Sequence, residues 1–251
     1  HGSQGLLHQR QVSLDGATPA SNDAIRGAGS FHRAVRAVEL LRQEGIEVSI
    51  NTVLTRLSFP ELDRLVELAA AFGAKFRVSR FRPSGRAKTV WEQLNVTPEQ
   101  LTTFSGWLAD HLEVSTGDSF FSVSTAERRA LGLNMCGASK LTCCIAPTGE
   151  LYPCAFLQEP EFRVGKLPEE SLAELWEQSP VFQSFRQLEI KSCEHCHRFD
   201  LCHGGCPAVA YHTQRRLGLP DPECLVNCVR VKTAEIKSPY ASSAAPRPVS
   251  A

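Results

Sequence analysis

Ten cysteines are the residues of this chain best suited to chemistry, and all of them follow Met135. The first cluster contains Cys136, Cys143, Cys144 and Cys154; the second reads Cys193-x2-Cys196-x5-Cys202-x3-Cys206 and is followed by Cys224 and Cys228. Two cysteines separated by two residues in a tight turn direct both sulfurs toward one ion or cluster, and such a turn seldom has the geometry of a disulfide. The spacing therefore predicts metal binding.

Spacing alone leaves two kinds of metal centre open. Four-cysteine zinc sites use similar pairs, so two structural zinc ions are one interpretation. Iron-sulfur clusters are the other, because thiols are abundant and because Gly204 and Gly205 offer backbone N–H groups to inorganic sulfide. Three nearby histidines are interpreted as neighbours of the metal centre rather than as its ligands: His195, His197 and His203.

The composition predicts a globular protein in a reducing compartment. The chain has 251 residues, a formal net charge of zero and 42% hydrophobic residues, enough for one or two domains with a core. No basic excess indicates nucleic acid binding, and no apolar run approaches the roughly 18 residues of a membrane helix. No secretory signal is recognisable over 1–10, so we expect a cytoplasmic protein with reduced thiols.

The elements that must position these cysteines begin with three strand-helix units. Strands are predicted over 11–14, 46–52 and 76–78, and helices over 30–41, 60–73 and 97–108. We expect Ser30 to cap the first helix, whereas Thr97 and Gln100 form a capping box on the third. Repeated units of this kind form a parallel sheet or barrel, which presents functional side chains at the C-terminal ends of its strands.

Short elements replace this rhythm after about Ser115. A hairpin is predicted over 144–154 and a short helix beginning after Ser171, with loops elsewhere. Ordering each residue costs about 1–2 kcal/mol of backbone entropy, so we expect bound metal to organise these loops. We predict three segments: a partial barrel over 1–115, a cysteine-rich domain over 116–237 and a disordered tail over 238–251.

One cysteine pattern has a known counterpart. The run Cys136-x12-Gly149-x4-Cys154, followed by the second cluster and Cys224, resembles the SPASM extension of radical S-adenosylmethionine (radical SAM) enzymes. Several short strings resemble those of mycofactocin maturases: SLDGAT (13–18), RGAGSF (26–31), RPSGR (82–86), TGDSFF (116–121), LNMCGAS (133–139), CHGGC (202–206) and DPEC (221–224). This resemblance implies an α/β fold, the C-terminal part of a partial (β/α) radical SAM barrel followed by a loop-rich SPASM iron-sulfur domain.

The same resemblance implies two auxiliary [4Fe-4S] clusters with interleaved ligands. One would take Cys136, Cys143, Cys154 and Cys206, and the other Cys193, Cys196, Cys202 and Cys224. Ligands that come from distant segments would crosslink those segments and stabilise the domain. Cys144 and Cys228 are left over, and Cys144 either competes with Cys143 or is a small buried side chain.

Cofactor-binding residues are also implied on the barrel strands. Ser13 and Asp15 would face the ribose of bound S-adenosylmethionine, with Asn51 on the next strand as a further candidate. A plain turn at Asp15-Gly16 is the structural alternative. Three arginines are candidates for pairing a carboxylate of the cofactor or of a peptide: Arg26, Arg80 and Arg82.

The chain departs from the family in one motif. Radical SAM enzymes bind their cofactor on a cluster held by Cys-x3-Cys-x2-Cys. This chain has two Cys-x3-Cys pairs, 202/206 and 224/228, but the positions where the third cysteine would follow, 209 and 231, are valines. With a start at His1 and only three predicted barrel strands, we expect that an N-terminal part is missing. The full-length enzyme would also bind S-adenosylmethionine and a third [4Fe-4S] cluster, and this fragment alone is expected to be inactive.

The resemblance implies a radical SAM peptide maturase of the mycofactocin type. Its reactions would be oxidative decarboxylation of a C-terminal tyrosine and a carbon–carbon bond from that tyrosine to the adjoining valine of a ribosomal precursor peptide. The implied partners are that peptide, a small peptide-binding chaperone protein and an electron donor such as ferredoxin or flavodoxin. The alternatives are another SPASM enzyme, acting on a different peptide or on a haem precursor, and a zinc-stabilised binding module.

Overall fold

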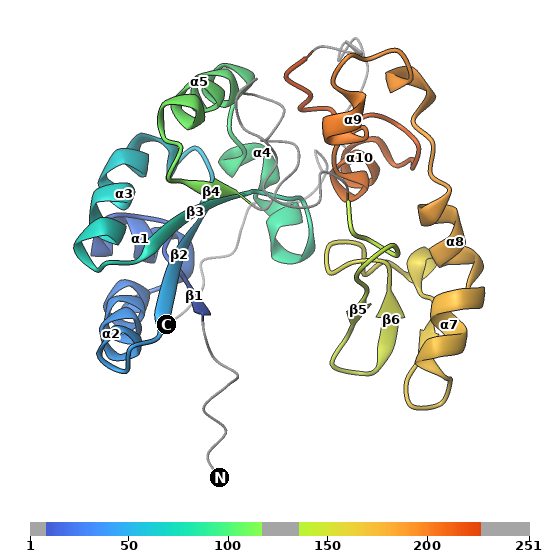
Figure 1. The fold of residues 1–251 in the computed structure, drawn as a ribbon, viewed down its shortest axis with the longest axis horizontal. Coiled ribbons are helices and arrows are strands. Elements are labelled where there is room, and N and C mark those ends of the chain that lie inside the picture. The colour runs from blue at the N-terminus through green and yellow to red at the C-terminus, as the bar shows by residue number, and fades with distance from the viewer. Residues whose placement is uncertain (1–8, 117–135, 227–251) are drawn as a thin grey trace.

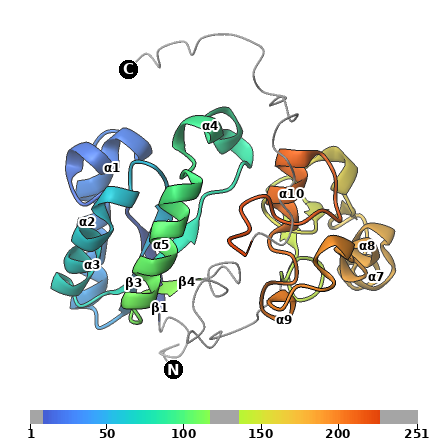
Figure 2. The same ribbon diagram turned by 90° about the horizontal axis from the view of Figure 1, so that it is seen from above.

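The computed structural model describes residues 9–116 and 136–226, which form two lobes lying side by side (Figures 1 and 2). Figure 1 shows strands β1–β4 and their helices in the first lobe, in blue to green, and β5, β6 and the later helices in the second, in yellow to orange. The tail predicted over 238–251, Cys228 and positions 117–121 lie outside the described residues.

The first lobe is built on a parallel sheet with strand order β1-β2-β3-β4. Its elements in chain order are β1 (Gln9–Ser13), α1 (Pro19–Arg26), α2 (Ser30–Gln43), β2 (Glu47–Leu54), a 3-10 turn (Phe59–Glu61), α3 (Leu62–Ala71), β3 (Lys75–Arg80), a second 3-10 turn (Gly85–Thr89), α4 (Trp91–Leu94), α5 (Pro98–Asp110) and β4 (Ser115–Thr116). The α/β architecture and its parallel sheet are as predicted. The short strand β4 adds a fourth member to the three strands predicted from the sequence.

The two faces of this sheet differ in chemistry because side chains alternate along each strand. Ile50, Val78 and Phe76 point to one face, where they form a buried core with Leu65 of α3 and Phe104 of α5. Figure 1 shows α2 and α3 on the side of the sheet away from the second lobe. The polar residues between these apolar positions are therefore left on the opposite face.

Helix α2 begins differently from the prediction. Ser30 is its first helical residue rather than its cap, and Gly29 occupies the N-cap position with a φ of +70°. Asp23 of α1 instead binds the free N–H groups at the start of α2. Its carboxylate accepts hydrogen bonds from the backbone N–H of Phe31 at 2.8 Å, from the backbone N–H of Gly29 at 2.6 Å and from the Ser30 hydroxyl at 2.9 Å. A carboxylate contributed by the preceding helix caps α2, and local spacing gave no sign of it.

We expect the stabilising effect of Asp23 to disappear in acid. The hydrogen bond from Phe31, with those from Ser30 and Gly29, lowers the pKa of Asp23 from its ordinary 3.8 to about 2. A carboxyl whose pKa is lower in the folded state stabilises the fold above its unfolded pKa, and this contribution is lost as pH falls. The difference in melting temperature between wild type and Asp23→Asn should therefore shrink between about pH 4 and pH 2; a constant difference would contradict it.

The predicted capping box of α5 is confirmed. The Thr97 hydroxyl accepts the N–H of Gln100 at 3.2 Å, and the Gln100 side chain accepts the N–H of Thr97 at 3.0 Å. The same reciprocal pair links Thr18 and Ser21 at the start of α1, which the sequence prediction missed. A threonine followed by proline precedes both helices, so this signal was present in the sequence.

The second lobe is assembled from short elements. In chain order they are β5 (Cys144–Ile145), β6 (Glu150–Tyr152), a 3-10 turn (Pro160–Phe162), β7 (Gly165–Lys166), α7 (Leu172–Gln178), α8 (Pro180–Arg186), a 3-10 turn (Lys191–Cys193), α9 (Phe199–Cys202) and α10 (Pro207–Gln214). The β5–β6 hairpin and α7 agree with prediction, whereas β7, α8 and α10 replace expected loop. Leu157, Phe162 and Phe185 form a small core with Ala208 of α10. In the described ranges, no helix is both long and apolar enough to span a bilayer.

Candidate metal centres and the pocket between the lobes

The cysteines of the second lobe approach one another in groups. None of the nine cysteines in the described ranges forms a disulfide. Burial, followed by the neighbouring sulfurs of Cys206 and Cys136, raises the pKa of the Cys154 thiol to about 12. Burial and then Cys206 likewise raise the pKa of Cys136. These three cysteines come from three separate segments, and only the fold brings them together.

A second group contains the remaining cysteines of the 193–224 segment. Burial raises the pKa of the Cys193 thiol to about 11, with added contributions from Cys202, Cys224 and Cys196. The pKa of Cys202 is raised by burial and by Cys224 and Cys196 as well. Cys202 and Cys206 thus belong to different groups, although only three residues separate them.

Cys143 lies apart from the first group among the described interactions. Burial and then the adjacent sulfur of Cys144 raise the pKa of Cys143. Cys143 also lines a surface pocket of about 560 Å³ together with Leu141 and Trp176. The sulfur that acts on Cys143 is therefore that of Cys144, the alternative candidate for the same ligand position.

Backbone N–H groups point at the sulfurs in a repeated pattern. In four cases the donor is the residue two positions later: Ala138 to Cys136, Phe156 to Cys154, Arg198 to Cys196 at 3.4 Å and Gly204 to Cys202. Such N–H dipoles favour the negative thiolate over the thiol. Because the thiolate is the form that ligates metals, the loops are shaped for metal-bound sulfur.

The sulfurs of each group are neighbours without surrounding one point. Within residues 9–116 and 136–226, no set of three or more cysteine, histidine or acidic side chains is placed to hold a single metal ion. A four-iron cube is larger than one ion, so its cysteine ligands stand further apart. The donor type and the N–H groups therefore fit a cluster with thiolate ligands.

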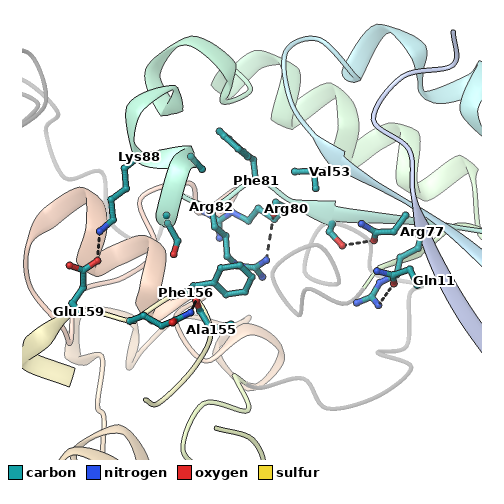
Figure 3. A pocket seen from close by; sticks show the side chains of 16 residues that line it. Gln11, Val53, Arg77, Arg80, Phe81, Arg82, Lys88, Ala155, Phe156 and Glu159 are labelled. Atoms are coloured by element: carbon teal, nitrogen blue, oxygen red, sulfur yellow. Dashed lines mark hydrogen bonds and ion pairs between the residues drawn. The ribbon is translucent and has the colours of Figure 1, made fainter. Parts of the chain in front are cut away.

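A pocket of about 870 Å³ lies between the polar face of the sheet and the second lobe. Figure 3 shows Gln11 and Arg77 at one end, where they are hydrogen-bonded at 3.2 Å, and Lys88 paired with Glu159 at the other. The second lobe closes the pocket opposite the strands with Ala155, Phe156, Gln158 and Glu159. Both lobes thus line one pocket, in which polar and apolar side chains are mixed.

The predicted cofactor-binding residues have different surroundings. Asn51 lines the pocket and accepts a hydrogen bond from the Ser79 hydroxyl at 2.6 Å, and Ser13 is its register partner on β1. Asp15 is buried, and its carboxylate accepts the Val53 N–H at 2.8 Å and pairs with Arg26 at 2.6 Å. Both Asp15 oxygens are therefore engaged in joining β1, β2 and α1.

The other two arginines are also placed by the structure. Arg82 lies over the Phe156 ring at 4.5 Å in the middle of the pocket (Figure 3). Arg80 is buried and pairs with Asp221 and Glu223 of the second lobe. These acids are the first and third residues of the DPEC string, but they were not recognised as partners of Arg80, because nothing in the sequence links Arg80 to Asp221, 141 positions later.

Comparison with known proteins shows which enzymes this chain resembles. Residues 136–198 match the family model of SPASM, an iron-sulfur cluster-binding domain. Over 221 residues the chain is 42% identical to the mycofactocin maturase MftC of Mycolicibacterium smegmatis, an alignment that covers 86% of this chain. The chain is thus similar, over most of its length, to radical SAM enzymes that carry a SPASM domain. It spans 56% of the length of that maturase.

More distant radical SAM/SPASM relatives share the same region. The AdoMet-dependent heme synthase of Oleidesulfovibrio alaskensis is 27% identical over 85% of this chain and 60% of its own length. The solved structure of anSMEcpe with bound AdoMet and Kp18Cys peptide has a TM-score of 0.63 at 18% identity, covering 87% of this chain and 64% of that one. The fold is therefore that of a radical SAM barrel part followed by a SPASM domain.

Proposed function

We propose that this chain is the auxiliary-cluster portion of a radical SAM peptide maturase of the mycofactocin type. The observation that carries the proposal is the separation of its cysteines into two coupled groups, within a chain 42% identical to a mycofactocin maturase. Free thiols of this kind persist in a reducing compartment, so the proposal places the protein in the cytoplasm.

Each cysteine group would hold one [4Fe-4S] cluster. Cys136, Cys154 and Cys206 would share the first with Cys143 or Cys144, and Cys193, Cys196, Cys202 and Cys224 would hold the second. When bound, clusters with four cysteine ligands supply a one-electron acceptor for the surplus electron of an oxidation. The chain's own N–H groups stabilise the thiolates, and Ala155, the residue after Cys154, lines the pocket.

The precursor peptide would lie in the pocket between the lobes. The pocket combines a polar sheet face, two guanidinium groups from Arg77 and Arg82, and the ring of Phe156. A peptide offers carbonyl groups, carboxylates and side chains that such a lining recognises. Ser13 and Asn51 on the same sheet would meet the S-adenosylmethionine of the full-length enzyme, with Asp15 fixing the strand ends behind them.

The reactions proposed are those of the mycofactocin maturases. Oxidative decarboxylation of a C-terminal tyrosine would release carbon dioxide, one hydrogen atom and one electron, with S-adenosylmethionine supplying the hydrogen acceptor when bound. A carbon–carbon bond to the adjoining valine would follow. A small peptide-binding chaperone protein would deliver the peptide, and ferredoxin or flavodoxin would supply electrons. The similarity to an AdoMet-dependent heme synthase keeps a haem precursor as the second substrate class to assay.

Metal analysis tests the proposal directly. After anaerobic reconstitution the chain should be brown and contain about eight irons and eight sulfides per chain, as two [4Fe-4S] clusters require. About two zinc ions in a colourless protein would instead identify a zinc-stabilised binding module. Assays of a full-length version with a precursor peptide and with a haem precursor, scored by 5'-deoxyadenosine release, would then distinguish the two substrate classes.

A further inference from the structure

A buried ion pair joins the two lobes next to the cysteine groups. Arg80 ends β3 of the first lobe, and Asp221 belongs to the second; their side chains are only 3% and 1% exposed. The guanidinium binds both Asp221 oxygens, one of them at 2.6 Å, and its Nε donates to Glu223 at 2.7 Å. A bidentate pair of this kind fixes orientation as well as distance.

Asp221 also organises the backbone around three residues of the cysteine loops. Its carboxylate accepts the N–H of Cys206 at 2.9 Å. Its own N–H donates to the Gly204 carbonyl at 2.9 Å, and its carbonyl accepts the N–H of Cys224 at 3.2 Å. Cys206 and Cys224 belong to different groups, so one residue holds a member of each in place, Cys206 through its side chain and Cys224 through its backbone carbonyl.

The charges of the pair act on both groups. Burial alone would lower the pKa of Arg80, but the carboxylates of Asp221 and Glu223 raise it well above its ordinary value, so the guanidinium stays charged. Arg80 interacts electrostatically with the sulfur of Cys206, and Asp221 with that of Cys202. Charges in a buried site of low dielectric are weakly screened, which gives them influence over a neighbouring redox centre.

We propose that Arg80 and Asp221 are positioning residues for the auxiliary clusters, holding the Cys206 and Cys224 loops against the sheet that lines the pocket and setting the reduction potential of the clusters. The inference rests on the proposed function, since it takes the cysteine groups to bind clusters. Reduction adds negative charge to a cluster, so removing the negative charge of Asp221 should favour the reduced state. Losing the Arg80 guanidinium should instead release the loops, because the buried carboxylate of Asp221 and the partly buried carboxylate of Glu223 lose their cationic partner.

Four variants of the 251-residue chain test this after anaerobic reconstitution. Asp221→Asn retains an oxygen for the Cys206 N–H but loses the charge, and Arg80→Met removes the fork. Arg80→Lys retains the charge without the bidentate geometry. Lys88→Met is the matched control, because Lys88 also pairs across the lobes, with Glu159. Iron content and the midpoint potential of each protein are measured by chemical analysis and redox titration.

The expected results distinguish a positioning role for Arg80 and Asp221 from a general contribution to the stability of the fold. Asp221→Asn should load iron and titrate at a more positive potential, Arg80→Met should lose about half or more of its iron, and Arg80→Lys should recover part of it. Lys88→Met should match wild type in both measurements. A wild-type potential in iron-loaded Asp221→Asn, or full iron in Arg80→Met, would overturn the inference.

The two Arg80 variants still test the inference if Asp221→Asn fails to fold. Equal iron in Arg80→Met and Arg80→Lys would then overturn it, and more iron in Arg80→Lys would support it. A wild-type chain without iron would contradict the proposed function instead.

Discussion

Replacing Cys206 with alanine should lower the iron content of the reconstituted chain from about eight to about four per chain. The sulfur of Cys206 interacts with those of Cys136 and Cys154. Cys202 lies four positions earlier in the same loop, and its sulfur interacts instead with those of Cys193 and Cys224. Removing one thiolate of a four-cysteine set exposes its cluster to loss, while the complete set retains its own. The remaining iron should therefore belong to the second group.

Double variants make this expectation sharper. Cys224→Ala alone should also retain about four irons, whereas Cys206→Ala with Cys224→Ala should retain almost none, because each change destroys a different cluster. Cys206→Ala with Cys136→Ala should match Cys206→Ala alone, because both residues belong to the first group. Equal iron in the two double variants would show that the cysteines do not act as the two sets proposed.

Gly205→Ala should lower the free energy of unfolding by about 2–5 kcal/mol. Gly205 has a φ of +87°, which L-residues with a side chain rarely adopt. An added methyl carbon would lie 2.3 Å from Cβ of Asp221 and 2.7 Å from its Oδ2. The substitution combines backbone strain with an overlap that displaces the carboxylate from the Cys206 N–H. Urea unfolding followed by circular dichroism measures the loss.

Gly106→Ala is the matched control for this prediction. Gly106 lies in helix α5, and an added methyl carbon there has nothing within 4 Å. Alanine is the better helix former by about 1 kcal/mol, so this variant should be as stable as wild type or more so. Equal stability of the two glycine variants would mean that the CHGGC loop tolerates a side chain, contrary to the packing described.

Prediction from the sequence succeeded where the determining interactions are local. The alternating apolar residues of β2 and β3 and the capping box of Thr97 and Gln100 depend on neighbours within a few positions, and both are confirmed. It failed for the start of α2, where Asp23 of the preceding helix replaces the expected Ser30 cap. It also failed for α10, which begins at Pro207 directly after Cys206, where loop was expected.

Spacing and periodicity are properties of the chain, so the residues alone predicted closely spaced thiols behind a set of strand-helix units. That Cys202 and Cys206 face different partners, and that Arg80 meets Asp221, follows only from the folded arrangement. It likewise showed that Asp15 is engaged by Val53 and Arg26. Such contacts join segments far apart in the chain, and they are selected by the packing of whole elements rather than by any local preference.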